Sequence, residues 1–356
     1  MKNDRKRTKV TLLDVARQAN VSRATASLVI RKSPLVGAGT RKRVEEAMHA
    51  LGYVYNMGAA RLRAKRSHTI GVIVPNLTNP FFAELLGGIE AAIDDAGLVM
   101  IIANSGDLVS RQSAVMQRMR EHGVDGIILC PAAGTGQDLP LLIASWTLPV
   151  VQVLRHVTSD LDYAGADYAA GMHQAVDHLA SLGHRSVALA VHGPLHSAYQ
   201  ERVESFRQAM TDQGLQMAII RVPDELAQIA DAMHLFVDRP ERFTAIVCFN
   251  DLVALGMAAG IHDCGLAVGR DISLVGFDDV SDAEAMRPRL TSVSTAPVTI
   301  GRNAATLLVE RIERPSLPPR RIISPTYLKE RQSCQAVSPL ATKTGWLRVD
   351  GGPQCF

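Results

Sequence analysis

Short apolar runs alternate with helical patterns from residue 69 onward, and this alternation constrains the fold more than any other feature. Runs such as TIGVIVP, at residues 69–75, lack the alternating polar positions of a half-exposed strand. Buried strands separated by helices are typical of a parallel α/β sheet covered on both faces. The other predicted strands are residues 98–103, 126–130, 150–154, 186–190, 216–222, 245–248 and 272–276, and the predicted helices are residues 80–96, 111–121, 171–181, 203–213, 225–237 and 252–263.

These units are too many for one small sheet, so the sequence predicts two α/β lobes with a break near residues 160–166. Ligands of parallel sheets bind outside the carboxyl ends of the strands. In a two-lobed body those ends face each other across a cleft, and there we expect a small-molecule site.

A different pattern precedes the body. Residues 11–30 predict two short helices joined by a tight turn, because Asn20 tolerates a left-handed backbone and Ser22 is a suitable N-cap. Helices joined so closely cross steeply, which leaves the second one free to enter a DNA groove. A third helix is predicted at residues 40–51, with Gly52 as its stop.

Charge separates these two parts of the chain. Residues 1–70 hold 16 Lys and Arg against 4 Asp and Glu, a net charge of +12, whereas the remainder holds 22 against 31, a net charge of −9. A basic head on an acidic body is typical of a nucleic-acid binder with a separate second function. A solvated basic tail is the alternative, but the charges are interleaved with helical apolar spacing.

Several other classes are disfavoured. The chain shows no phosphate loop, dinucleotide fingerprint, GxSxG elbow or HExxH helix, and His184 and His192 near predicted strand ends are interpreted as structural. No secretory signal and no bilayer-length apolar run is found, so a cytoplasmic protein without metal or cofactor is expected. The five cysteines form no CxxC pair, which fits a reducing compartment; they are Cys130, Cys248, Cys264, Cys334 and Cys355.

Taken together, these segments resemble the LacI/GalR (lactose repressor) family of bacterial transcription regulators over roughly residues 9–334. The helix-turn-helix resemblance lies in TLLDVARQANVSRATAS, and TRKRVEEAMHALGYVYN and NMGAARLR resemble the third helix and the hinge. Further matching pieces are IGVIVPNLTNPFFAELLGGIE, HLASLGHRSVAL, ERVESFRQAM, FNDLVALG, ISLVGFDD and LTSVSTAPVTIGRNAATLLVERI. The resemblance implies a helix-turn-helix head on a two-lobed, periplasmic-binding-protein-like body.

For the head, the resemblance implies that Arg23, Ala24 and Leu28 face the bases, and that Leu62 inserts into the minor groove. An alternative for Leu28 is packing against the third helix, and this stays open. Ala60 and Arg61 depart from the family's usual arginine and serine. The predicted phosphate contacts are Thr25, Ser27, Asn56 and Arg61.

For the cleft, the resemblance implies an effector site at Asn79, Phe81, Phe82, Leu154, Arg202, Asn250, Asp251 and Asp278. Periodicity favours Phe81 as core and Phe82 as the pocket ring. Arg202 and Asp278 are the preferred ligand contacts, whereas Asp251 has the alternative of only capping a helix. Leu154 replaces the aspartate of many sugar-binding relatives and Arg155 adds a positive charge, which leaves a less polar or acidic metabolite open.

The sequence thus predicts a repressor that binds a near-palindromic operator as a homodimer and is switched by a small-molecule effector, a sugar or related metabolite. A periplasmic-type solute-binding protein is the alternative, disfavoured by the missing signal peptide. The predicted domains are a head at 1–55, a hinge and linker at 56–68, a first lobe at 69–164 and 296–319, a second lobe at 165–295 and 320–334, and a disordered tail at 335–356.

Overall fold

The computed structural model describes residues 10–30, 33–53, 66–136, 139–237 and 243–337. The chain divides into two compact units, a head at Met1–Ser67 and a body at His68–Phe356.

In the described residues of the head, three helices form: α1 (Leu12–Gln18), α2 (Arg23–Ile30) and α3 (Ala38–Leu51). Asn20 has a φ of 50°, so the predicted left-handed turn is confirmed, and the Ser22 hydroxyl accepts the Thr25 N–H at 3.0 Å. Gly52, with a φ of 60°, ends α3 as predicted. A small apolar core joins the three helices and consists of Val15, Ala16, Ala19, Ala26, Val29, Val44 and Ala47.

The first lobe of the body is a parallel six-stranded sheet in the order β11-β5-β4-β3-β1-β2. Its strands are β1 (Thr69–Val74), β2 (Val99–Asn104), β3 (Gly126–Leu129), β4 (Val150–Val153), β5 (Asp162–Ala166) and β11 (Arg321–Ser324). Its helices are α5 (Pro80–Asp94), α6 (Val109–Glu121), α7 (Leu139–Ala144) and α14 (Pro297–Glu313).

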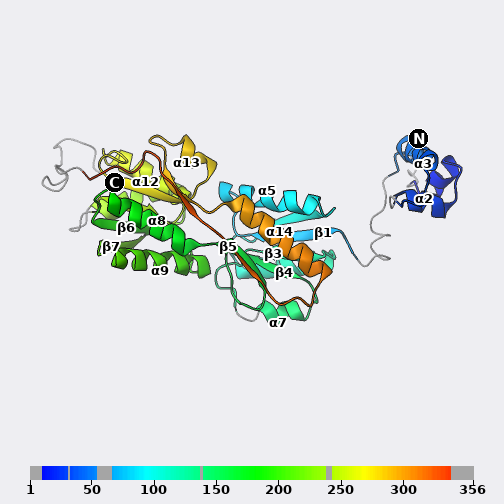
Figure 1. Ribbon diagram of the computed structural model, residues 1–356, viewed down its shortest axis with the longest axis horizontal. Coiled ribbons are helices and arrows are strands. Elements are labelled where there is room, and N and C mark those ends of the chain that lie inside the picture. The colour runs from blue at the N-terminus through cyan, green and yellow to red at the C-terminus, as the bar shows by residue number, and fades with distance from the viewer. Residues whose placement is uncertain (1–9, 31–32, 54–65, 137–138, 238–242, 338–356) are drawn as a thin grey trace, which may run out of the picture. The chain divides into compact units, whose positions relative to one another are not determined.

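Helices α5 and α14 lie side by side in this lobe (Figure 1). Glycines permit their close approach, because a Cβ at Gly88 would lie 2.1 Å from the Val298 carbonyl oxygen and one at Gly301 would lie 2.2 Å from the Leu85 carbonyl oxygen. This packing attaches α14, from late in the sequence, to a lobe that begins the body.

The second lobe is a six-stranded sheet in the order β12-β10-β9-β8-β6-β7, in which β12 alone runs antiparallel to its neighbour. Its strands are β6 (Ser186–Val191), β7 (Gln216–Arg221), β8 (Ala245–Cys248), β9 (Ser273–Asp278), β10 (Thr291–Ser294) and β12 (Tyr327–Lys329). Its helices are α8 (Tyr168–Ser181), α9 (Ser197–Asp212), α10 (Leu226–Ile229), the 3₁₀ turn η1 (Ala230–Met233), α11 (His234–Val237), α12 (Asp251–Asp263) and α13 (Ser281–Ala285).

In the described residues of the body, the backbone passes between the lobes at three short connections. They lie at Asp167 between β5 and α8, at residues 295–296 between β10 and α14, and at residues 325–326 between β11 and β12. A polar latch at His156 also joins the lobes. The backbone N–H of His156 donates to the Ser197 hydroxyl at 2.8 Å, and its ring Nε2 lies 2.9 Å from a Glu201 carboxylate oxygen.

Two predicted lobe boundaries are wrong. The first lobe does not end at residue 164, because β5 continues to Ala166 and pairs with β4. The second lobe does not resume at residue 320, because β11 pairs in parallel with β5 of the first lobe. Neither strand was predicted, since a break was placed at β5 and no long apolar run marks β11.

The predicted disordered tail also begins too early. The carbonyl oxygen of Gln335 lies 3.2 Å from His184 Nε2, and the Val337 N–H donates to the Leu182 carbonyl oxygen at 3.0 Å. His184 also bonds Thr244 and Ser273, which confirms its structural role. The rest of that predicted tail lies outside the described residues.

Across the described residues, every helix is too short or too polar to cross a bilayer.

Candidate functional site

The outer face of α2 carries the predicted base-reading side chains. Arg23 and Ala24 are exposed, and Leu28 is half-exposed and is not among the described apolar side chains that pack on the head core. That arrangement disfavours the alternative in which Leu28 packs against the third helix. The base and phosphate contacts of α2 stay predictions, as do those of Asn56, Arg61 and Leu62, which lie outside the described residues.

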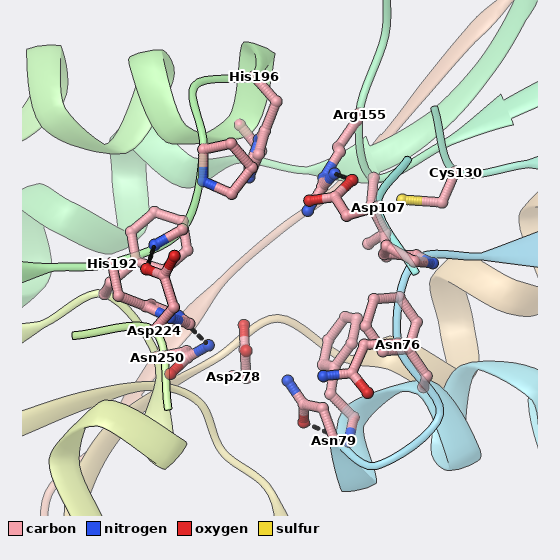
Figure 2. Close-up of a pocket in the computed structure, with 18 of the residues that line it drawn as sticks. Asn76, Asn79, Asp107, Cys130, Arg155, His192, His196, Asp224, Asn250 and Asp278 are labelled. Carbon is pink, nitrogen blue, oxygen red and sulfur yellow. Dashed lines mark hydrogen bonds and ion pairs between the residues drawn. The ribbon is translucent and has the colours of Figure 1, made fainter. Parts of the chain in front are cut away.

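A cavity of about 380 Å³ lies between the two lobes of the body. It opens beyond the carboxyl ends of the strands, as predicted for parallel sheets. Figure 2 shows Asp107 and Arg155 together on one side, with His192 and Asn250 opposite them. The predicted residues that line the cavity are Asn79, Phe81, Phe82, Leu154, Arg202, Asn250 and Asp278.

Arg202 is the most constrained of these side chains. It donates from Nη1 to the Phe249 carbonyl oxygen and from Nη2 to the Asp278 carboxylate, at 3.1 Å for the latter. Its guanidinium also lies 4.4 to 4.7 Å from the ring centroids of Tyr168, Phe249 and Phe277. Arg202 therefore uses both terminal nitrogens to hold the wall of the cavity, a geometry that does not favour its predicted role as a preferred ligand contact.

Asp278 ends β9 with a φ of 107°, a conformation that is strained for a residue with a Cβ. Burial raises its carboxyl pKa from 3.8 to about 6, although the nearby Arg202 guanidinium opposes this shift. Leu154, at the end of β4, is also left-handed, with a φ of 62°. The backbone is thus strained at the cavity in both lobes.

The two phenylalanines of α5 do not divide as predicted. Both Phe81 and Phe82 are buried and both line the cavity, with ring centroids 5.4 Å apart in an edge-to-face arrangement. Asn79 lines the cavity too, but its side-chain oxygen accepts the Phe81 N–H and caps the helix.

Asp251 was predicted to line the effector site, and this is wrong. Its carboxyl group is buried behind the wall, where it accepts the Val280 N–H at 2.8 Å and pairs with the Ser292 hydroxyl at 2.6 Å. Gly276 makes room for it, since a Cβ there would lie 2.0 Å from an Asp251 oxygen. Burial raises the pKa of Asp251 to about 8. The N-cap of α12 is instead Asn250.

Sequence reasoning did not identify several lining residues. His192, interpreted as structural, lies 3.2 Å from the Asn250 amide, and His196 caps α9 by accepting the Tyr199 N–H at its Nδ1. Burial lowers the pKa of both imidazoles, that of His196 to about 2, so both rings are neutral near pH 7. The remaining polar members missed are Asn76, Asn104, Asp107, Tyr168 and Asp224.

One signal could have found part of this group. Asn104 and Asp107 come within four residues after the predicted strand at 98–103, and Arg155 directly follows the one at 150–154. Residues after parallel strands gather at one sheet edge. His196 and Asp224 lie further from their strands, so their positions depend on loops. Within the described ranges, no three His, Cys, Asp or Glu side chains gather in a group able to hold a metal ion.

The chain matches two family profiles. Residues 11–56 match the bacterial regulatory proteins of the lacI family, and residues 67–332 match the periplasmic binding proteins and sugar binding domain of the LacI family. Among curated relatives, the HTH-type transcriptional repressor PurR of Vibrio cholerae is 32% identical over 307 residues, which cover 85% of this chain and 91% of that protein.

Solved structures give the same result. The lac repressor dimer bound to operator and the anti-inducer ONPF is 27% identical, with a TM-score of 0.82, over 92% of this chain and 100% of the other. The transcriptional regulator CelR in complex with cellobiose is 28% identical, with a TM-score of 0.68, over 91% of this chain and 99% of the other. The head, the two-lobed body and these relatives define a DNA-binding transcriptional regulator and not an enzyme. The chain belongs to the LacI family.

Proposed function

We propose that this protein is a cytoplasmic repressor that binds a near-palindromic operator as a homodimer. A small molecule in the inter-lobe cavity either releases it from the operator or promotes its binding to the operator. The observation that carries the proposal is the cavity of about 380 Å³, lined by polar groups from both lobes, in a chain that also carries a helix-turn-helix head. A ligand that contacts both lobes binds one lobe arrangement better than another, and only this difference in affinity can switch the protein.

The dimer is supported by apolar side chains on sheet edges. Strand β2 is the edge of the first sheet and exposes Val99, Ile101 and Ile102 by 62, 45 and 41%. Strand β7 is the edge of the second sheet and exposes Met217. Such a stripe on a long edge is a liability in a monomer. A two-fold dimer would cover it and present two recognition helices to two half-sites.

A sugar or related metabolite is the proposed effector class. The matched body profile is described as a sugar binding domain, and the CelR structure holds cellobiose. A solute-binding protein without a regulatory role is the alternative, but the head supports regulation, because its exposed Arg23 lies on a helix with a buried opposite face.

A metabolite screen on the full chain tests this proposal. We expect at least one compound to raise the midpoint of thermal unfolding and to change binding to an operator selected from random DNA. As a matched pair, Arg23→Ala should weaken the selected operator by about 10- to 100-fold, as loss of a bidentate guanine contact does, whereas Arg17→Ala on α1 should change it less. A screen without any compound that alters DNA binding would contradict the regulatory role of the cavity.

A further inference from the structure

Among the described helices, three begin at the cavity, and each has a cap supplied by a lining residue. A helix N-terminus binds anions through unsatisfied backbone N–H groups, so an internal cap occupies the place that a ligand oxygen would take. Helix α5 also begins with Pro80, which has no N–H. The caps are Asn79, which accepts the Phe81 N–H at 3.0 Å, His196, which accepts the Tyr199 N–H at 3.1 Å, and Asn250, which accepts the Val253 N–H at 2.9 Å.

The positive side chains at the cavity are also compensated. Arg202 pairs with Asp278, and Arg155 pairs with Asp107 at 2.6 Å. Burial keeps His192 and His196 neutral, as described above. Among the described residues that line the cavity, no cation therefore lacks a carboxylate partner. An anionic ligand would lose its hydration without gaining an unpaired positive charge.

The two ion pairs differ in how they face the cavity. Arg202 and Asp278 are only 7 and 6% exposed, whereas Arg155 and Asp107 are 14 and 21% exposed. Arg155 donates through Nη1 to Asp107 and to the Pro131 carbonyl oxygen, so in the described part of the chain its Nε and Nη2 are left to donate to a ligand. Asp107 also accepts the Ala133 N–H at 2.9 Å, which fixes its carboxylate beside the guanidinium.

Local backbone geometry holds this pair at the cavity. Leu154 is left-handed, and the Arg155 N–H donates to the Val153 carbonyl oxygen at 2.6 Å, so the chain turns sharply before Arg155. Asp107 is left-handed as well, with a φ of 57°. A left-handed backbone is unfavourable for residues other than glycine, so the surrounding structure must hold both positions. Figure 2 shows the two side chains together on the first-lobe wall.

We infer that Asp107 and Arg155 determine the charge class of the effector: the pair selects an uncharged molecule, whose acceptor groups are bound by the free N–H groups of Arg155. Asp107 cancels the charge that would otherwise attract a carboxylate or a phosphate ester. This inference rests on the proposed function, in which the cavity holds the effector, and it argues against the acidic metabolite that the sequence left open.

Inorganic phosphate tests the inference without knowledge of the effector. The full-length wild type, Asp107→Asn and the double variant Asp107→Asn/Arg155→Met are titrated at pH 7.5 and low salt by calorimetry, with thermal unfolding to confirm folding. Phosphate bound by the basic head contributes equally to all three proteins. We expect Asp107→Asn to bind phosphate at least about tenfold more tightly than the wild type, the gain that one charge-assisted hydrogen bond supplies, and the double variant to lose that gain.

Two results would overturn the inference. One is equal phosphate affinity in the wild type and Asp107→Asn, and the other is a gain that survives in the double variant. An anionic compound that binds the wild-type cavity more tightly than its uncharged counterpart would do the same. Failure of the proposed function would be seen in a different experiment, as a metabolite screen in which no compound alters DNA binding. The phosphate titration gives its result whether or not that screen succeeds.

Discussion

The two walls of the cavity are built in different ways from similar residues. Each wall carries an arginine paired with an aspartate beside a residue with a positive φ. Arg202 lies among three aromatic rings, whereas the hydrogen bonds of Arg155 to the described residues use only Nη1. The second-lobe pair therefore supports the fold, and the first-lobe pair is available for selection. This difference shows that the role of an arginine in a ligand cavity depends on which of its N–H groups remain free to donate, and not only on its presence at the cavity.

Removal of the second-lobe arginine should produce the largest effect. Arg202→Ala leaves Asp278 buried without its cation and opens space among the rings, so the free energy of unfolding should fall by about 3–5 kcal/mol. Arg155→Ala, at the more exposed pair, should cost about 1 kcal/mol or less. Denaturant unfolding of both variants measures the difference. Equal losses would remove the distinction between the walls.

The buried carboxyl behind the second wall should give a pH dependence. Asp251 keeps its proton in the folded chain up to a pH of about 8, whereas its ordinary pKa is 3.8. The folded state thus binds more protons in this window, so stability from this group is greatest at low pH and is lost as pH rises toward 8.

Asp251→Asn removes that titration while keeping an acceptor for the Val280 N–H. Relative to this variant, the wild type should lose up to about 1.4 kcal/mol of unfolding free energy per pH unit between pH 5 and 8, and little further above about pH 9. Unfolding curves of both proteins at several pH values provide the check. Parallel pH profiles would show that Asp251 is ionised throughout.

The latch between the walls should give the smallest effect. The Glu201 carboxylate is 40% exposed and His156 is 28% exposed, so Glu201→Gln should change the balance of lobe opening by less than about 1 kcal/mol. Because the His156 N–H bonds Ser197 across the lobes, its hydrogen exchange reports on opening. We expect exchange to accelerate a few-fold in Glu201→Gln and to stay unchanged in Glu204→Gln, which alters the exposed Glu204 on the same helix. Unchanged exchange at His156 in both variants would mean that Glu201 does not hold the lobes together.

Much of the fold was predictable from local pattern, because strands buried on both faces are continuous apolar runs. Strand β10, which lies between β12 and β9 in the second sheet, was not predictable in this way, since it is the short segment TSVS, with Thr291 and Ser292 fully buried. Their polarity is satisfied by distant groups: the Thr291 N–H donates to the Ser333 hydroxyl, and Ser292 bonds Asp251. A local sequence pattern does not indicate hydrogen-bond partners that are distant in the sequence.

The same limit of local sequence patterns determines which residues of the cavity could be predicted. Seven of the eight predicted effector positions line the cavity: six of them end or follow strands or lie at helix starts, whereas Arg202 lies inside α9. Asp251 does not line the cavity. Asn250 caps α12 and faces the cavity, whereas the carboxyl group of the next residue, Asp251, is buried behind the cavity wall. The pairing of Arg155 with Asp107 joins segments 48 residues apart and was accessible only from the fold.

The repeated passage of the chain between the lobes has a consequence for synthesis. The strands that close the two sheets, β11 beside β5 and β12 beside β10, are made last, long after the head has left the ribosome. A premature stop codon before residue 321 would therefore leave both β5 and β10 as bare edges, which invite aggregation. Nonsense mutations late in the gene should deplete the protein instead of releasing a DNA reader that has lost its sensor.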